Sequence, residues 1–136
     1  MFKVKMITIG KLREKWLASA LEEYKRRLKG SVDIDWLLLK SEGELNAWGE
    51  NHSFVALDSN GTLLTSEAFS EKLFQLGLRI NFLIGGANGL SKNLLQKALF
   101  VWSLSPLTFT HQMTRLILVE QLYRGIEIEK GSKYHK

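Results

Sequence analysis

The sequence contains no cysteine, one proline and three histidines among its 136 residues. The absence of cysteine excludes a disulfide framework, a thiolate zinc site and a cysteine nucleophile, and it is typical of proteins in a reducing cytoplasm. The histidines are His52, His111 and His135, and none lies four residues from another, so we expect no metal site. No stretch approaches the roughly 18 consecutive apolar residues of a membrane span, so we expect no membrane partner.

Length and composition predict a single domain over residues 1–136. Apolar residues make up 45% of the chain and charged residues 24%, which is ordinary for a globular protein and excludes the disordered class. The formal net charge is +5. Such a basic excess favours a polyanionic partner, such as nucleic acid, without identifying one.

Hydrophobic periodicity predicts strands that alternate with helices along the whole chain. We expect strands at 2–9, 32–39, 53–57, 79–84 and 100–103, helices at 12–28, 66–76, 91–99 and 112–130, a short helix within 41–49, and a turn at 58–61. The first helix is expected to bury a stripe of Leu12, Trp16, Ala20, Tyr24 and Leu28. The runs 54–57 and 82–84 are apolar enough to be buried on both faces. This pattern predicts an α/β fold with a mainly parallel sheet flanked by helices.

Ligands of such sheets bind beyond the carboxyl ends of the strands. Three segments are expected there: Leu57-Asp58, the glycine-rich residues 85–90, and residues 104–110 with the only proline. The glycines permit close approach of a ligand, but their spacing matches neither a dinucleotide fingerprint nor a phosphate-binding P-loop. A tight strand-to-helix turn explains 85–90 equally well, and a plain connection is the commoner meaning of 104–110.

The last predicted helix is apolar on nearly every side, which indicates burial on more than one side, as at a subunit interface. Glu120 lies within its apolar run and needs a polar partner, for which Arg115 and Arg124 are candidates. Gly125 in mid-helix indicates that another element packs closely there. An ordinary core helix with a solvated charged face is the alternative.

The chain ends on Tyr134, His135 and Lys136, which bring together a phenol, an acid–base group and a cation. Lys130 and Lys133 add positive charge nearby. Such residues can contact RNA phosphates and bases, and His135 titrates near neutrality. A flexible basic tail without a function is the alternative.

Five motifs together resemble one family closely: Leu-Ile-Gly-Gly-Ala-Asn-Gly-Leu at 83–90, Trp-Ser-Leu-Ser at 102–105, Leu-Thr-Phe at 107–109, Arg-Leu-Ile-Leu-Val-Glu-Gln-Leu-Tyr-Arg at 115–124, and the final Tyr-His-Lys. They are similar to the ribosomal RNA large subunit methyltransferase H family, a small branch of the SPOUT methyltransferases. The resemblance covers nearly the whole chain. It implies a C-terminal trefoil knot, S-adenosylmethionine bound in the knot of a homodimer, and N3-methylation of a pseudouridine in 23S rRNA of the ribosome.

The resemblance also implies roles for particular residues. The cofactor would be bound by Leu57, Gly86, Ser105, Pro106, Leu107, Thr108, Phe109 and Thr110. Tyr134 and His135, helped by Arg124, would form the methyl-transfer site, with His135 taking the N3 proton. Arg115, Lys133 and Lys136 would hold RNA phosphates or help to order the site.

The sequence departs from the family pattern in three places. Residues 40–51 form a shorter segment than usual, and Thr110 and Lys133 stand where proline is common. Two other functions stay open: a non-catalytic module of the same fold that binds RNA or the ribosome, and a methyltransferase of this fold that acts on tRNA.

Overall fold

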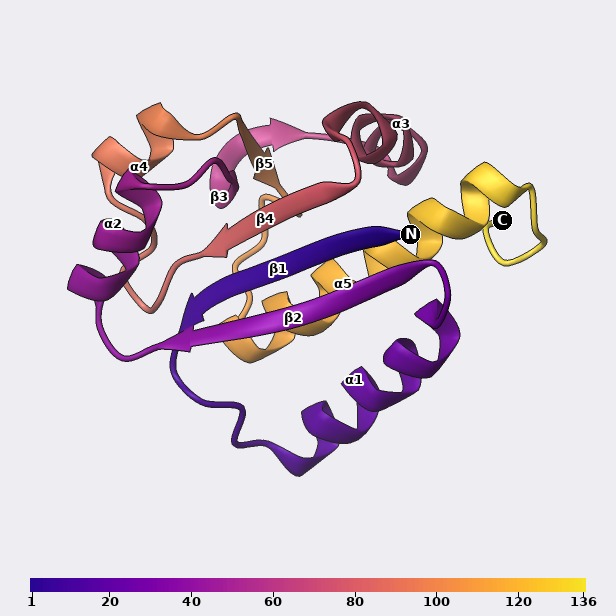
Figure 1. The fold of residues 1–136 in the computed structure, drawn as a ribbon, viewed down its shortest axis with the longest axis horizontal. Helices are drawn as coiled ribbons and strands as arrows, with labels where there is room; N and C mark the ends of the chain where they lie inside the picture. The colour runs from indigo at the N-terminus through magenta and orange to yellow at the C-terminus, as the bar shows by residue number, and fades with distance from the viewer.

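The computed structural model describes residues 1–136. Five strands and five helices alternate along the chain (Figure 1). The strands are β1 (Phe2–Ile9), β2 (Val32–Leu39), β3 (Val55–Leu63), β4 (Arg79–Ile84) and β5 (Phe100–Ser103). The helices are α1 (Lys15–Leu28), α2 (Glu42–Glu50), α3 (Ser66–Leu76), α4 (Lys92–Lys97) and α5 (His111–Lys130).

The strands form one sheet in the order β2-β1-β4-β3-β5, and every neighbouring pair is parallel. The prediction of an α/β fold with a mainly parallel sheet flanked by helices is therefore confirmed. Because all strands run in one direction, their carboxyl ends share one edge of the sheet. This edge gathers the segments that the sequence placed after the strands.

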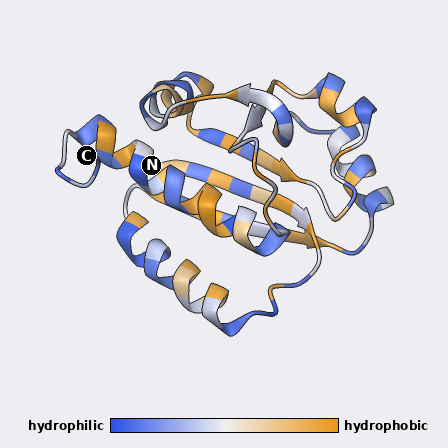
Figure 2. Cartoon of the chain, turned by 180° about the vertical axis from the view of Figure 1, so that it is seen from behind, coloured by the Kyte–Doolittle hydropathy of each residue, from blue (hydrophilic) through white to orange (hydrophobic).

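Helices cover both faces of the sheet. α1, α3 and α5 lie on one face, with α5 between the other two (Figure 2), and α2 and α4 lie on the opposite face. An apolar cluster of 17 buried residues, including Met6, Phe82 and Leu118, fills the first interface, and one of seven, including Ile7 and Leu83, fills the second. Adjacent residues Met6 and Ile7 point to opposite faces, so this part of β1 is buried on both sides, whereas Lys3 and Lys5 make the start of the strand alternate between apolar and polar residues.

Side-chain caps explain where four of the helices begin. The hydroxyls of Ser41, Thr65, Ser91 and Thr110 accept hydrogen bonds from backbone N–H groups three residues later, at 3.1 to 3.3 Å. Each bond satisfies one N–H that has no partner within the helix. At its other end, α5 stops at Gly131, which has a left-handed φ of 69°. A residue with a side chain rarely adopts that conformation.

β3 continues through the residues that the sequence predicted to form a turn, so that prediction was wrong. Leu57 and Thr62 both pair with Trp102 of β5, and the residues between them form a bulge. Gly61 belongs to this bulge, and a Cβ atom there would lie 2.8 Å from the carbonyl oxygen of Val101. Only glycine allows the two strands to approach so closely, so the turn-like composition serves a bulge within the strand.

The prediction for α1 needs two corrections. The helix begins at Lys15 rather than Leu12, because the preceding residues carry the chain from β1 to the helical layer. The buried stripe runs through Leu17, Leu21, Tyr24 and Leu28, so the end of the predicted stripe is confirmed, whereas Leu12 and Trp16 are exposed, Trp16 by 49%. A stripe with a strict four-residue repeat rotates by about 40° per step around a helix, so it cannot stay on one face.

Candidate active site

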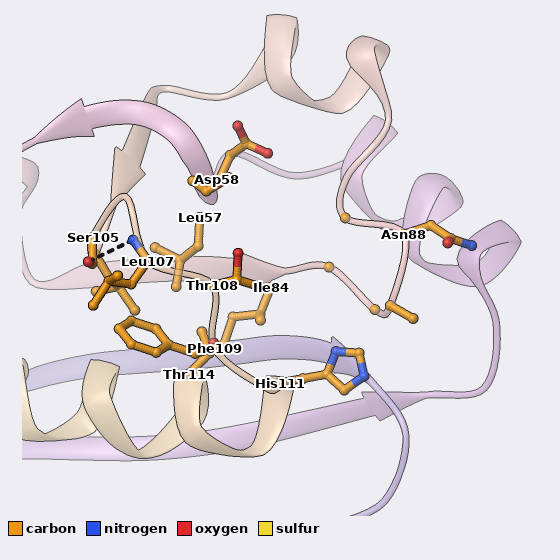
Figure 3. Close-up of a pocket in the computed structure, with 16 residues that line it drawn as sticks. Leu57, Asp58, Ile84, Asn88, Ser105, Leu107, Thr108, Phe109, His111 and Thr114 are labelled. Carbon is orange, nitrogen blue, oxygen red and sulfur yellow. Dashed lines mark hydrogen bonds between the residues drawn. The ribbon is translucent and has the colours of Figure 1, made fainter.

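A cavity of about 350 Å³ lies at the carboxyl edge of the sheet, among the bulge of β3, the end of β4, the glycine loop (residues 85–90), the loop 104–110 and the start of α5 (Figure 3). Its volume is within the range of small-molecule sites. Six of the eight predicted cofactor residues line it: Leu57, Gly86, Ser105, Leu107, Thr108 and Phe109. The structure therefore brings together two loops that are far apart in the sequence.

Pro106 and Thr110 do not line this cavity. Thr110 is the N-cap of α5, and its hydroxyl accepts a hydrogen bond from the amide of Met113. The loop is further shaped by Ser105, whose hydroxyl accepts a bond of 3.0 Å from the amide of Leu107. In this geometry, Thr110 orients the loop and the helix rather than contacting the contents of the cavity.

The glycine loop is a tight structure that leaves no room for side chains on its inner face. Gly86 and Gly89 form an antiparallel bridge, and Gly89 has a φ of 71°. A Cβ atom at Gly85 would lie 2.5 Å from the carbonyl carbon of Gly89. The loop thus needs glycine for its own closure, and it also presents bare backbone to the cavity.

α2 supports the glycine loop from outside. The hydroxyl of Ser91 donates a hydrogen bond of 3.0 Å to the amide oxygen of Asn46, and the side-chain amide of Asn88 donates one of 3.4 Å to Glu42. Leu45 of α2 is buried in the same apolar cluster as Leu90, the last residue of the loop. The segment 40–51, which the sequence analysis expected to be shorter than usual, therefore holds one wall of the cavity.

Polar residues outside the predicted cofactor set also line the cavity: Asp58, Ser59, Asn88, His111 and Thr114. Asp58 follows Leu57 at the carboxyl edge, and His111 is the first residue of α5; Figure 3 shows the two on different sides of the cavity. Asp58 belongs to a segment that the sequence analysis expected at this edge, and His111 directly follows another. Asp58 places a carboxylate where a ligand's amine or hydroxyl groups could bind.

Arg115 is fully buried, so it is not placed to contact an RNA phosphate as predicted. Its Nη2 atom donates hydrogen bonds to the carbonyl oxygens of Ile9 and Gly10, at 3.0 and 2.9 Å. No carboxylate faces it, and desolvation lowers its pKa, although an arginine keeps its proton in proteins. The structure gives Arg115 the second of its predicted roles, that of ordering the site, by tying the exit of β1 to the first turns of α5.

The substitution Arg115→Met tests this role, because methionine keeps the length of the stem without the hydrogen bonds. No carboxylate offsets the desolvation of the charge, so we expect the free energy of unfolding to stay within about 1 kcal/mol of the wild type. Cofactor binding should weaken about tenfold, the equivalent of one lost hydrogen bond of about 1.4 kcal/mol, since the exit of β1 is then free to move. Urea unfolding and a cofactor titration measure both quantities. A large loss of stability with unchanged cofactor affinity would contradict the ordering role.

A second group of polar residues, the tail cluster, joins the C-terminal residues to α5 and α3. It consists of Glu67, Glu120, Arg124, Tyr134 and His135. Glu120 accepts hydrogen bonds from the Nε atom of Arg124 at 3.1 Å and from the hydroxyl of Tyr134 at 2.7 Å. Imidazole Nδ1 of His135 lies 3.0 Å from Nη1 of Arg124, and its Nε2 lies 2.7 Å from Glu67. The tail is therefore docked, and the expected partner of Glu120 is Arg124 and not Arg115.

These contacts define the protonation of the tail cluster. An arginine can only donate hydrogen bonds, so Nδ1 of His135 accepts, and Nε2 carries the proton that is donated to Glu67. Desolvation and the hydrogen bond to Glu120 raise the pKa of Tyr134 above its usual range. Tyr134 thus keeps its proton and acts as a donor, and His135 in this arrangement is neutral with both nitrogens occupied.

The tail cluster does not meet the cavity within one chain. The cavity lies at the start of α5 and the tail cluster beyond its middle, and the helix has 20 residues, which corresponds to about 30 Å. Figure 1 shows the C-terminus at the opposite end of α5 from the carboxyl edge of the sheet. Lys133 and Lys136 are exposed at this same end. The predicted catalytic residues and the predicted cofactor residues therefore occupy separate places.

The structure contains neither a group of metal ligands nor a membrane-length helix. No three His, Asp or Glu side chains lie close enough together to hold a metal ion. No helix has the length and hydropathy that crossing a membrane requires.

Comparisons with known proteins show the family of the chain. The sequence profile of a family described as a predicted SPOUT methyltransferase matches residues 2–135. A protein of Protochlamydia amoebophila named ribosomal RNA large subunit methyltransferase H is 48% identical over 141 positions, which cover 100% of both chains. The chain belongs to this family of SPOUT methyltransferases. The resemblance stated from the motifs is therefore confirmed.

Other members of the ribosomal RNA large subunit methyltransferase H family align over nearly their whole length. The Enterococcus faecalis protein is 38% identical, with 98% of this chain and 99% of the relative covered. That alignment spans 158 positions against the 136 residues of this chain, so the relative carries residues that have no counterpart here. A probable methylase family protein from Haemophilus influenzae shares the fold, with a TM-score of 0.63 at 13% identity over 98% of this chain and 70% of that chain.

Proposed function

We propose that this protein transfers a methyl group from S-adenosylmethionine to N3 of a pseudouridine in 23S rRNA. The observation that carries the proposal is the cavity at the carboxyl edge, in a chain whose relatives are named ribosomal RNA large subunit methyltransferase H. Its wall combines bare glycine backbone with apolar side chains and a few polar groups. This is the composition expected of a site for a nucleoside with a charged amino-acid end.

The residues of the cavity fit the cofactor chemically. Leu57, Leu107 and Phe109 provide apolar contacts for a flat base, and the backbone of loop 104–110 provides donors and acceptors for its edge. Gly85, Gly86 and Gly89 line the cavity without side chains, so a ligand can approach their backbone closely. When bound, the sulfonium of S-adenosylmethionine supplies an already activated methyl group. The protein's task is therefore to place the acceptor nitrogen in line and to remove its proton.

We assign the removal of the N3 proton to His135, acting through Nδ1. In the docked tail that nitrogen accepts a hydrogen bond from Arg124, so Arg124 must release it first. Once released, the guanidinium of Arg124 is available to stabilise the anionic base that deprotonation creates. Tyr134, whose pKa is raised, retains its proton and serves as a donor or as a stacking partner for the nucleotide.

We further propose that the protein works as a homodimer in which the tail of one subunit completes the cavity of the other. The separation between cavity and tail cluster along α5 supports this arrangement, because two antiparallel copies of α5 bring the end of one helix to the start of the other. α5 also carries half-buried apolar residues, including Leu116 and Ile117, that its own chain leaves partly uncovered. A trefoil knot around the cavity and action in the cytoplasm complete the proposal, and both stay predictions.

Transfer of labelled methyl groups tests the proposed function. Three substrates would be tested separately with labelled S-adenosylmethionine as donor: isolated ribosomal subunits that lack this modification, assembled ribosomes that lack it, and tRNA. We expect label in N3-methylpseudouridine of the large-subunit rRNA. Label in tRNA alone would retain the enzyme class and overturn the substrate. No label from a protein that binds RNA would favour a non-catalytic module of the same fold.

A further inference from the structure

The connection between β1 and α1, residues 10–14, forms part of the surroundings of the cavity. It leaves the same edge of the sheet at which β3 and β4 end. Ile9 directly precedes the connection, and its side chain would lie 3.3 Å from a Cβ atom at Gly86. The carbonyl oxygen of Gly10 accepts a hydrogen bond from Arg115. Arg115 is one turn beyond His111, which lines the cavity. The connection is therefore anchored beside the mouth of the cavity.

Three cations stand on this connection and on the residue that follows it. Lys11, Arg13 and Lys15 are all exposed, and none of them forms an ion pair. The neighbouring carboxylate is Glu14, which is also exposed and does not pair with them. By contrast, the arginines at the other end of α1 are neutralised by a carboxylate of the same helix. Unpaired positive charge beside a cavity attracts an anionic partner.

An exposed aromatic residue lies next to these cations. Trp16, in the first turn of α1, is 49% exposed. Proteins that bind unpaired RNA combine cations that follow the phosphates with aromatic side chains on which bases stack. An acidic protein surface would use the cations alone, so the tryptophan favours RNA as the partner.

We propose that residues 11–16 form the RNA-binding rim of the site: Lys11, Arg13 and Lys15 bind phosphates on the strand that carries the target nucleotide, and Trp16 stacks on a neighbouring unpaired base. This inference rests on the proposed function, because it names the part of the protein that holds the substrate RNA. The proposal also assigns the main phosphate contacts to exposed residues of the adjoining connection rather than to Arg115, which is buried.

A pair of matched double variants tests the phosphate contacts. K11Q/R13Q removes two charges from the rim, and K3Q/R79Q removes the same two charge types at paired, exposed positions at the opposite edge of the sheet. Binding to ribosomes that lack the modification would be measured from low to high salt, together with cofactor affinity. We expect K11Q/R13Q to weaken RNA binding at least tenfold and to reduce the slope of log affinity against log salt by about 2. K3Q/R79Q should bind like the wild type.

Trp16→Ala tests the stacking contact, which involves no charge. We expect about tenfold weaker RNA binding with an unchanged salt slope, since base stacking adds to affinity without releasing counterions. Gel filtration and circular dichroism accompany both measurements. A shift of Trp16→Ala toward monomers would show that Trp16 belongs to the subunit interface, and it would overturn the stacking assignment.

Binding and turnover separate this proposal from the proposed function. If the wild type binds ribosomal RNA without transferring methyl groups, the enzyme assignment fails and the binding series still decides the rim. Equal loss in K11Q/R13Q and K3Q/R79Q would show a general effect of net charge and would overturn the rim. Wild-type affinity in K11Q/R13Q, or no RNA binding by the wild type, would also overturn it.

Discussion

Removal of residues 134–136 is expected to lower the rate of methyl transfer by about 10²- to 10⁴-fold, the usual contribution of a general base. The affinity for S-adenosylmethionine should stay unchanged, because the tail packs on α5 from Glu120 onward and no residue of the tail cluster lines the cavity of its own chain. Isothermal titration of the cofactor and single-turnover transfer to ribosomes measure the two quantities separately. A parallel loss of both would show that the tail acts on folding or on the cofactor rather than on the transfer step.

Mixing two inactive chains tests whether the tail acts across subunits. One chain lacks residues 134–136, and the other carries Gly85→Ala, which disables the cavity but keeps the tail. In a two-fold symmetric dimer each mixed pair then holds one intact cavity facing one intact tail, so random pairing should restore about a quarter of the wild-type activity. Each chain alone should stay inactive. No recovery, in a mixture shown to contain mixed dimers, would rule out completion of the site by the partner.

Gly85→Ala is expected to weaken cofactor binding by at least about 100-fold, the equivalent of about 3 kcal/mol. The added Cβ would lie 2.5, 2.8 and 2.9 Å from the carbonyl carbon, the oxygen and the Cα atom of Gly89. These are backbone atoms of the bridge that closes the loop, so no side-chain rotation relieves the overlap. The loop must open, and the wall of the cavity moves with it. Cofactor titration and thermal unfolding measure the result.

Gly43→Ala provides the matched control for the same chemical change. Its Cβ would meet only the hydroxyl of Ser41, at an ordinary 3.7 Å, near the start of α2. We expect wild-type cofactor affinity and a gain in stability of about 0.5–1 kcal/mol, because alanine restricts the unfolded chain. If Gly43→Ala and Gly85→Ala weakened cofactor binding equally, steric closure of the loop would not be the cause.

The sequence predicted the sheet well because parallel strands leave a clear trace in it. The predicted bounds of four strands, 2–9, 32–39, 79–84 and 100–103, match the structure, and residues buried on both faces, such as Phe82 and Leu83, give apolar runs. β3 was extended by a bulge whose composition, ending in Gly61, is that of a turn. Composition alone does not distinguish the two, because the deciding contact is with β5, some 40 residues further along the chain.

The candidate site was predictable in its location and less so in its geometry. The rule that ligands bind at carboxyl ends placed Leu57, the glycine loop and loop 104–110 together, and the cavity confirms that grouping. The burial of Arg115 was not predictable, because an arginine four residues from His111 on a helix has the same pattern whether it faces RNA or the exit of a strand. The separation of the tail cluster from the cavity along α5 could not be predicted from the sequence either.

The support of the glycine loop by α2 has a consequence for how this family varies. Asn46 and Glu42 hold the loop through side chains alone, and no strand of the sheet passes through the segment that they occupy. That segment can therefore differ in length between relatives without disturbing the five-stranded scaffold. Each such change rebuilds one wall of the cavity, so the outer helix is an adjustable part through which related enzymes can tune affinity for the same methyl donor.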